Sequence, residues 1–254
     1  MTKNLFQKLS IILYPLVSIA LMLLIWQLLF AYVGSEFIFP SIGATLSQMW
    51  QHLCDGTFWH ALLLTLGRVL LCFAISLALA IVVGALAKFA PAVGKVLAPI
   101  VAIFRSAPTV AVMVILTLIV PRTITPMIVG LLVVFPMTYT NVTTAIAQVD
   151  NDVLQMCSLY NVPPVQQFKF VYFPTVSQYL LGELPATLSF TVKLIISAEI
   201  LSNTPRSVGG LIQLAKSYSN MASMFALTIL SVMFATLLDV ALKSVENKIK
   251  GGAR

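Results

Sequence analysis

Charged side chains are scarce in this sequence of 254 residues. Only 9% of the residues are charged, 59% are hydrophobic, and the mean hydropathy is +1.00. Soluble domains carry roughly 25% charged residues, so this scarcity excludes a water-soluble domain and places the chain in a bilayer. The net charge of +7 is then no evidence for nucleic-acid binding, because basic residues of membrane proteins mainly set topology.

Residues that bind metals or carry out catalysis are also few. Cys54, Cys72 and Cys157 lack paired or metal-ligand spacing, which indicates neither a disulfide framework nor a zinc site. His52 and His60 have no acidic or thiol partners at ligand spacing. Because no Ser-His-Asp, Cys-His or paired-carboxylate arrangement is present, the sequence predicts no catalytic, cofactor-binding or metal-binding residue.

Two short motifs are misleading. The stretch from Gly210 to Ser217 is a P-loop pattern with Ala215 in place of its second glycine, and it falls in a predicted outer loop without a preceding strand. The glycosylation sequon Asn141-Val142-Thr143 lies in or beside a predicted span on its inner side. We therefore expect neither a nucleotide site nor a glycan.

Six apolar stretches each approach the ~20 residues that cross the hydrocarbon of a bilayer. They lie at 11–33, 61–87, 97–120, 125–147, 175–201 and 222–245. The first lacks a small-residue cleavage pattern, so we interpret it as a retained span rather than a signal peptide. The sequence predicts an all-α integral membrane protein with about six spans in a single domain, residues 1–254.

Basic residues set the predicted orientation. The loop at 34–60 contains no Lys or Arg, whereas most basic residues fall in segments that would lie on the opposite side: Lys3, Lys8, Lys88, Lys95, Lys169, Lys243, Lys248, Lys250 and Arg254. Positive-inside bias then places both termini in the cytoplasm. Arg122, Arg206 and Lys216 fall on the predicted outer side, against this rule.

Residues 150–172 form the longest polar interruption, which we call the docking segment. Asn151 is predicted as the N-cap of a short helix, and Asn161 as the left-handed residue that ends it before Pro163-Pro164 start a second one. Apolar residues recur on one side of the first helix: Val153, Met156, Cys157 and Tyr160. The segment is too short to span, so its apolar side needs a partner surface.

Polar residues also interrupt the fifth predicted span. Ser189, Lys193 and Ser197 repeat every four residues and share one helix face, and Glu199 lies near the outer end. Intramembrane charge normally faces the bundle interior or a water-filled path, which favours a translocation pathway. The alternative is that Lys193 extends toward the interface or pairs with a carboxylate. Arg105, near the cytoplasmic end of the third span, leaves the same two interpretations open.

The docking segment resembles the coupling loop in permease subunits of binding-protein-dependent ABC importers. That family has Glu-Ala-Ala, then a glycine, then an apolar-Pro pair. The same spacing here holds Gln155-Met156-Cys157, then Asn161, then Phe173-Pro174. The Glu, both Ala and the Gly are replaced, although Asn is the best substitute for Gly in a left-handed turn.

Further stretches resemble the nitrate, sulfonate, taurine and thiamine-precursor branch of that family, over roughly residues 35–250. They are Phe39-Pro40-Ser41, Asp55-Gly56-Thr57, Leu66-Gly67-Arg68, Gly84, Phe104-Arg105-Ser106-Ala107-Pro108, Phe135-Pro136, Asn141, Ser197-Ala198-Glu199 and Gly209-Gly210-Leu211.

The resemblance implies a permease in the bacterial plasma membrane. Two such subunits, expected to be a homodimer, line one pathway, dock on a cytoplasmic ATPase dimer that binds ATP and Mg, and receive a small nutrient from an external binding protein. The nutrient would be a sulfonate, nitrate or taurine-like anion, or a thiamine precursor. The residues expected at the ATPase contact are Val153, Gln155, Cys157, Tyr160, Asn161 and Pro174. Those expected along the pathway are Arg105, Ser189, Lys193, Ser197 and Glu199.

Two other classes of protein remain open. An ion-coupled secondary transporter could use Lys193 and Glu199 as its coupling pair, but such transporters are usually built from internal repeats, and the docking segment would be unexplained. A membrane scaffold would leave the polar stripe of the fifth span without a function.

Overall fold

The computed structural model describes the backbone of residues 2–251 and the side chains of residues 13, 14, 16–241, 243 and 244. Within this part the chain is built from helices, with no strand, so the predicted all-α membrane fold is confirmed. Several basic side chains used for the predicted orientation lie outside the described residues: Lys3, Lys8, Lys248, Lys250 and Arg254.

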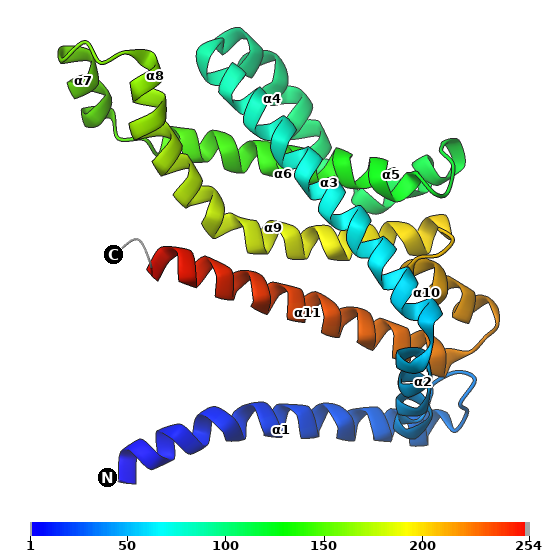
Figure 1. The fold of residues 1–254 in the computed structure, drawn as a ribbon. Coiled ribbons are helices and arrows are strands. Elements are labelled where there is room, and N and C mark those ends of the chain that lie inside the picture. The colour runs from blue at the N-terminus through cyan, green and yellow to red at the C-terminus, as the bar shows by residue number, and fades with distance from the viewer. Residues whose placement is uncertain (1, 252–254) are drawn as a thin grey trace.

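Five described helices are long and apolar enough to cross a membrane. They are α1 (Thr2–Val33), α3 (Gly56–Phe89), α6 (Thr125–Ala147), the continuous run into α9 (Phe173–Ser202) and α11 (Met221–Gly251). The short helices α2 (Ile42–Cys54) and α10 (Val208–Ser217) lie at one end of these spans, and α7 (Asn151–Leu159) and α8 (Pro164–Gln167) lie at the other (Figure 1). We call these the α10 end and the α7 end.

The predicted third span, 97–120, is not one helix, which corrects the sequence-based expectation. Its residues form α4 (Pro91–Ser106) and α5 (Thr109–Ile119), whose axes differ by 94°. Pro108 has no N–H to continue α4, and Ala107 before it takes extended backbone angles, φ −64° and ψ 134°. With 11 residues, α5 is only about 16 Å long, too short to cross the bilayer by itself.

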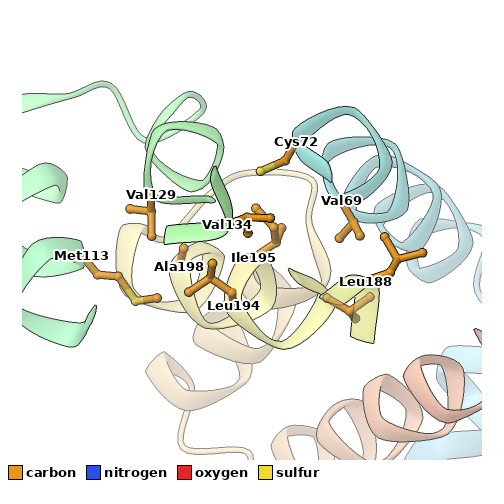
Figure 2. Packing of buried hydrophobic residues seen from close by; sticks show 10 residues of the cluster. Val69, Cys72, Met113, Val129, Val134, Leu188, Leu194, Ile195 and Ala198 are labelled. Atoms are coloured by element: carbon orange, nitrogen blue, oxygen red, sulfur yellow. The ribbon is translucent and has the colours of Figure 1, made fainter. Parts of the chain in front are cut away.

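The core lies where α3, α6 and α9 meet. Val69 and Cys72 of α3, Val129 and Val134 of α6 and Ile195 of α9 are all buried together (Figure 2). At Gly130 of α6 a Cβ atom would stand 2.8 Å from the Ile195 side chain and even nearer to that of Cys72. The missing side chain therefore lets three spans approach closely, as small residues do in membrane helix packing.

A buried ion pair joins α3, α9 and α10 near the α10 end. Glu199 is 0% exposed, and Arg68 Nη1 donates to its Oε1 at 2.8 Å. Thr65 Oγ1 donates to the same carboxylate at 2.9 Å and accepts from Val208 N at 3.1 Å, while Gly209 N donates to Oε2 at 3.3 Å. A buried carboxylate is tolerated because it is paired and hydrogen-bonded in this way.

Gly209 allows α10 to reach that carboxylate. A Cβ atom at this position would stand 2.7 Å from the backbone N of Ile200 and 2.8 Å from the carbonyl O of Ile196, and it would overlap Cβ of Glu199. The first turn of α10 therefore lies directly on the backbone of α9. Only glycine fits this position without moving one of the two helices.

Aromatic contacts attach α1 at the α10 end. Trp26 Nε1 donates to the Pro40 carbonyl at 3.0 Å, and the Trp26 ring meets the rings of Phe39 and Phe225 with centroids 5.9 and 5.5 Å away. Nearby, His52 Nε2 lies 2.8 Å from Ser223 Oγ, which joins α2 to α11. Burial lowers the pKa of His52 below its ordinary value, which favours the neutral form of the ring.

Breaking the buried ion pair is expected to destabilise the fold strongly. Glu199→Ala leaves Arg68, 20% exposed, without its carboxylate, and removing one partner of a buried pair costs about 3–5 kcal/mol. Unfolding free energies in mixed detergent–SDS micelles, followed by circular dichroism, measure this loss. The matched control is Lys243→Ala, which breaks the more exposed 2.9 Å pair with Asp239 and should cost at most about 1 kcal/mol. Equal losses would contradict the structural role of Glu199.

The close approach of α10 to α9 gives a second prediction. Gly209→Ala is expected to lower the unfolding free energy in the same assay, because its Cβ overlaps Glu199 and the backbone of α9. The control Gly67→Ala adds a Cβ in open space within α3, where Ala is favoured over Gly by about 1 kcal/mol. A neutral or stabilising Gly209→Ala would show that α10 does not pack as described.

Candidate functional site

The docking segment starts one residue earlier than predicted. Asp150, not Asn151, is the N-cap of α7, and its side chain accepts from Asp152 N at 2.8 Å. Asp150 has the extended backbone that a cap needs, with φ −61° and ψ 124°, whereas Asn151 is already helical. Asp and Asn cap helices about equally well, so side-chain preference alone did not distinguish the two positions.

The end of α7 follows the sequence-based prediction. Asn161 is left-handed, with φ 51°. Asn161 N donates to Ser158 O at 3.1 Å and Val162 N to Cys157 O at 2.9 Å, which is the pair of bonds of a Schellman motif. Gln167 Nε2 also donates to Val162 O at 2.9 Å. Hydrogen bonds to both α7 and α8 therefore hold the turn between these two short helices in place.

The apolar side of α7 faces away from the rest of the chain. No residue of α7 is buried, and Met156, Leu159 and Tyr160 are 56%, 79% and 78% exposed. Most of the predicted contact residues are exposed as well, and one is half-buried: Val153, Gln155, Tyr160, Asn161 and Pro174 are exposed, and Cys157 is half-buried. The docking segment thus presents an uncovered apolar surface beyond the α7 end of the spans (Figure 1).

The docking segment continues into α9 without a break. The predicted second short helix and a separate span starting near 175 are instead α8, a π-helical turn η1 (Phe168–Tyr172) and α9 in succession. Pro174 has no N–H for the ordinary helical bond, and in η1 the N–H of Phe173 reaches back five residues to Phe168 O. The second half of the docking segment and α9 therefore form one continuous helix from Pro164 to Ser202.

A polar groove runs between α9 and α11. It encloses about 650 Å³, and Ser189, Lys193 and Ser197 of α9 all line it, so their predicted common face is confirmed. Ser189 Oγ donates to Asp239 Oδ1 of α11 at 2.9 Å, and Lys243 Nζ donates to Oδ2 at 2.9 Å. Lys193 also lines a second hollow of about 450 Å³ beside α5, so this residue borders two open spaces.

Glu199 and Arg105 do not line either hollow. Glu199 lies six residues beyond Lys193, which turns its side chain by about 240° around the helix, and it pairs with Arg68. The Lys193–Glu199 coupling pair of the secondary-transporter interpretation is therefore not formed. Arg105 is exposed at the end of α4, where its Nη1 donates to Thr140 Oγ1 at 3.3 Å.

Sequence reasoning missed Asp239. Its spacing of four residues from Lys243 was a readable signal for a helical ion pair. Its bond to Ser189 was not readable, because it joins helices 50 positions apart.

Comparison with known proteins assigns the chain to a family. A family model described as "Binding-protein-dependent transport system inner membrane component" matches residues 76–251. Sixteen chains of solved structures match. One belongs to the methionine ABC transporter MetNI in an inward-facing conformation, with a TM-score of 0.59, 17% identity and coverage of 73% of this chain and 92% of that chain. At this identity the likeness shows the fold alone. Comparison with curated proteins gives no match.

The matched family region includes the docking segment, the polar groove and all of α9. It also covers more than half of the 254 residues. The chain therefore belongs to the family of binding-protein-dependent transport system inner membrane components, the membrane-spanning permeases of ABC transporters.

Proposed function

We propose that this chain is the permease subunit of an ATP-driven importer in a bacterial plasma membrane. The docking segment binds a cytoplasmic ATPase subunit, and the groove at Lys193 borders the path of the substrate. One observation carries the proposal: the helix that starts in the exposed docking segment continues into α9, which carries Lys193. The ATPase contact on α7 is thus joined by one short turn to the helix that carries the residues along the path.

The ATPase contact is formed by the uncovered side of α7. Val153 and Tyr160 are 38% and 78% exposed on a segment that carries no buried residue of its own. Contiguous exposed apolar surface of this kind marks an interaction site. Gln155 adds a polar contact, and the Schellman turn at Asn161 keeps the segment stiff enough to transmit force. ATP and Mg bind to the partner, and this chain supplies no catalytic group.

Transmission follows α9. Pro174 and Lys193 are 19 positions apart, about 28 Å along a helix. When two ATPase subunits close on ATP, the docking segments of two permeases approach each other, and each α9 tilts with its own segment. The groove then changes from open at the α7 end to open at the α10 end, where an external binding protein releases the substrate.

A second copy of the chain completes the path. The groove is bounded by α9 and α11 and open on its remaining side, and a homodimer would close it. An exposed lysine beside the hydroxyls of Ser197 and Thr228 suits a small anion, in line with a sulfonate, nitrate or taurine-like substrate. A thiamine precursor is the other nutrient class that the family resemblance suggested.

The proposed orientation places the α7 end in the cytoplasm. The first turn of α1 and the last turn of α11 lie at that same end (Figure 1), so both termini are cytoplasmic. Lys88, Lys95 and Lys169 lie at this end too, as positive-inside bias requires.

ATPase docking is tested by a pair of matched tyrosines. Tyr160→Ala is expected to abolish co-purification of the ATPase subunit with the tagged permease, because it removes a 78%-exposed ring from the docking segment. The control is Tyr218→Ala at the α10 end, a residue with the same exposure and nearly the same backbone angles at the end of α10. Co-purification that persists in Tyr160→Ala, or is lost equally in both variants, would disprove docking through α7.

The water-filled path is tested by adjacent cysteines in a cysteine-free background. Ser197→Cys is expected to react with a charged, membrane-impermeant methanethiosulfonate reagent, because the residue is exposed to the groove. Ala198→Cys, at a position 0% exposed, should not react. Leu70→Cys, exposed on α3 and expected to face lipid, should not react either, because hydrocarbon suppresses the thiolate. Labelling of Leu70→Cys but not Ser197→Cys would contradict the proposed path.

A further inference from the structure

An apolar crevice lies at the α7 end, apart from the polar groove. It is bounded by the last turns of α3, the last turns of α6, and the π-helical turn η1 with the start of α9. Its walls include Ile81, Phe89, Val142, Phe168 and Phe173. Lys88, in the last turn of α3, is the only charged residue among its lining residues.

The size of the crevice fits part of a hydrocarbon chain. It encloses about 200 Å³, below the ~300–1,000 Å³ of sites that enclose a whole small molecule. Water does not fill a cavity with walls of this kind, because it finds too few polar partners. In a membrane-spanning chain, the apolar groups available at this level are lipid acyl chains.

The charge around the crevice favours an anionic lipid. Lys88 is exposed and lines the crevice with the aliphatic part of its side chain, which leaves its ammonium group outside the apolar walls. Lys95 and Lys169 are exposed on α4 and η1 at the same end. Gly94 packs against Ala87 of α3, which brings the turn that carries Lys95 beside the end of α3. The carboxylates nearest to the lining residues along the chain belong to Glu183, three positions beyond Leu180, and to Asp150 and Asp152 near the start of α7. None of the three residues is part of the lining.

A second crevice provides an internal comparison. It lies between α3, α4 and α6, encloses about 290 Å³ and is lined by apolar residues such as Leu97, Phe104 and Phe135. No charged residue is among its lining residues. If apolar shape alone selected the occupant, both crevices would accept the same lipids.

We propose that the crevice at Lys88 binds an anionic phospholipid of the adjacent leaflet, with one acyl chain between α3, α6 and η1 and the phosphate on the Lys88 ammonium. This site is separate from the ATPase contact on α7 and from the groove proposed for the substrate. Because η1 forms one wall, a bound chain stabilises the π-helical turn and with it the position of the docking segment relative to α9.

The test uses the full-length protein in lipid nanodiscs and quenching of a single added tryptophan. Phe173→Trp places the reporter in the crevice wall, and the signal of the parent protein, with Trp26, Trp50 and Trp59, is subtracted. Phosphatidylglycerol with a brominated acyl chain is compared with brominated phosphatidylcholine at equal mole fractions. The anionic lipid is expected to bind about fivefold more tightly, the factor that ~1 kcal/mol per lysine near the membrane surface represents.

Two lysine variants distinguish lipid binding at a defined site from attraction of lipid by the general positive charge of the surface. Lys88→Gln is expected to remove the preference for phosphatidylglycerol, whereas Lys95→Gln, which changes an exposed lysine outside the lining, keeps it. A reporter in the second crevice, Phe104→Trp, should be quenched equally by both lipids. Equal quenching of Phe173→Trp by both lipids, or equal effects of the two lysine variants, would overturn the proposal.

A crevice-filling variant tests the acyl-chain position independently of charge. Ala85→Phe is expected to reduce quenching of Phe173→Trp by both brominated lipids, because the new ring occupies the space of the chain. Circular dichroism and gel filtration verify that each variant keeps its helices and remains monodisperse. Undiminished quenching in folded Ala85→Phe would show that the chain does not enter the crevice.

Discussion

The carboxylate of Glu199 is fully buried in a helix that crosses the membrane, and much of the α10 end is arranged around it. Three groups donate hydrogen bonds to this carboxylate. They are the guanidinium of Arg68 and the hydroxyl of Thr65, both on α3, and the backbone N–H of Gly209 on α10. Each donor comes from a helix that must stay in place for the carboxylate to remain buried. The three helices are therefore held in one relative arrangement, and the groove lies on a different face of α9.

This arrangement explains why three short motifs of the family resemblance occur together. Arg68 and Glu199 are 131 positions apart in the chain, and Gly209 lies ten positions beyond Glu199, yet all three take part in one buried cluster. All three take part in helix packing, and none of them lines the groove. The polar residues that line the groove lie on a different face of α9, with Lys193 at their centre.

The second constraint is the unbroken helix from Pro164 to Ser202. It joins an exposed docking segment at one end to the buried Glu199 cluster at the other, with the groove between them. The π-helical turn before Pro174 departs from regular helix geometry, and it forms a wall of the crevice at Lys88. Pro185 interrupts the ordinary hydrogen bonding a second time, inside α9. A force applied at α7 and a lipid bound at this turn would therefore act on the same element, which links the proposed transport cycle to the surrounding bilayer.

Local features were readable because they depend on neighbours in the chain. Scarcity of charge and apolar runs of about 20 residues determined a helical membrane protein, and Asn161 before Pro163-Pro164 determined the left-handed end of α7. The four-residue repeat of Ser189, Lys193 and Ser197 likewise determined their common face. The separation of Glu199 from that face follows from its spacing of six residues from Lys193, and the sharp bend follows from Pro108, so both were also readable. Only the tertiary structure decided the pairing of Glu199 with Arg68. Only the structure, too, decided the contact of Asp239 with Ser189. These features depend on which helices contact each other in the membrane. Helix periodicity gives no information about a contact residue that lies far away in the sequence.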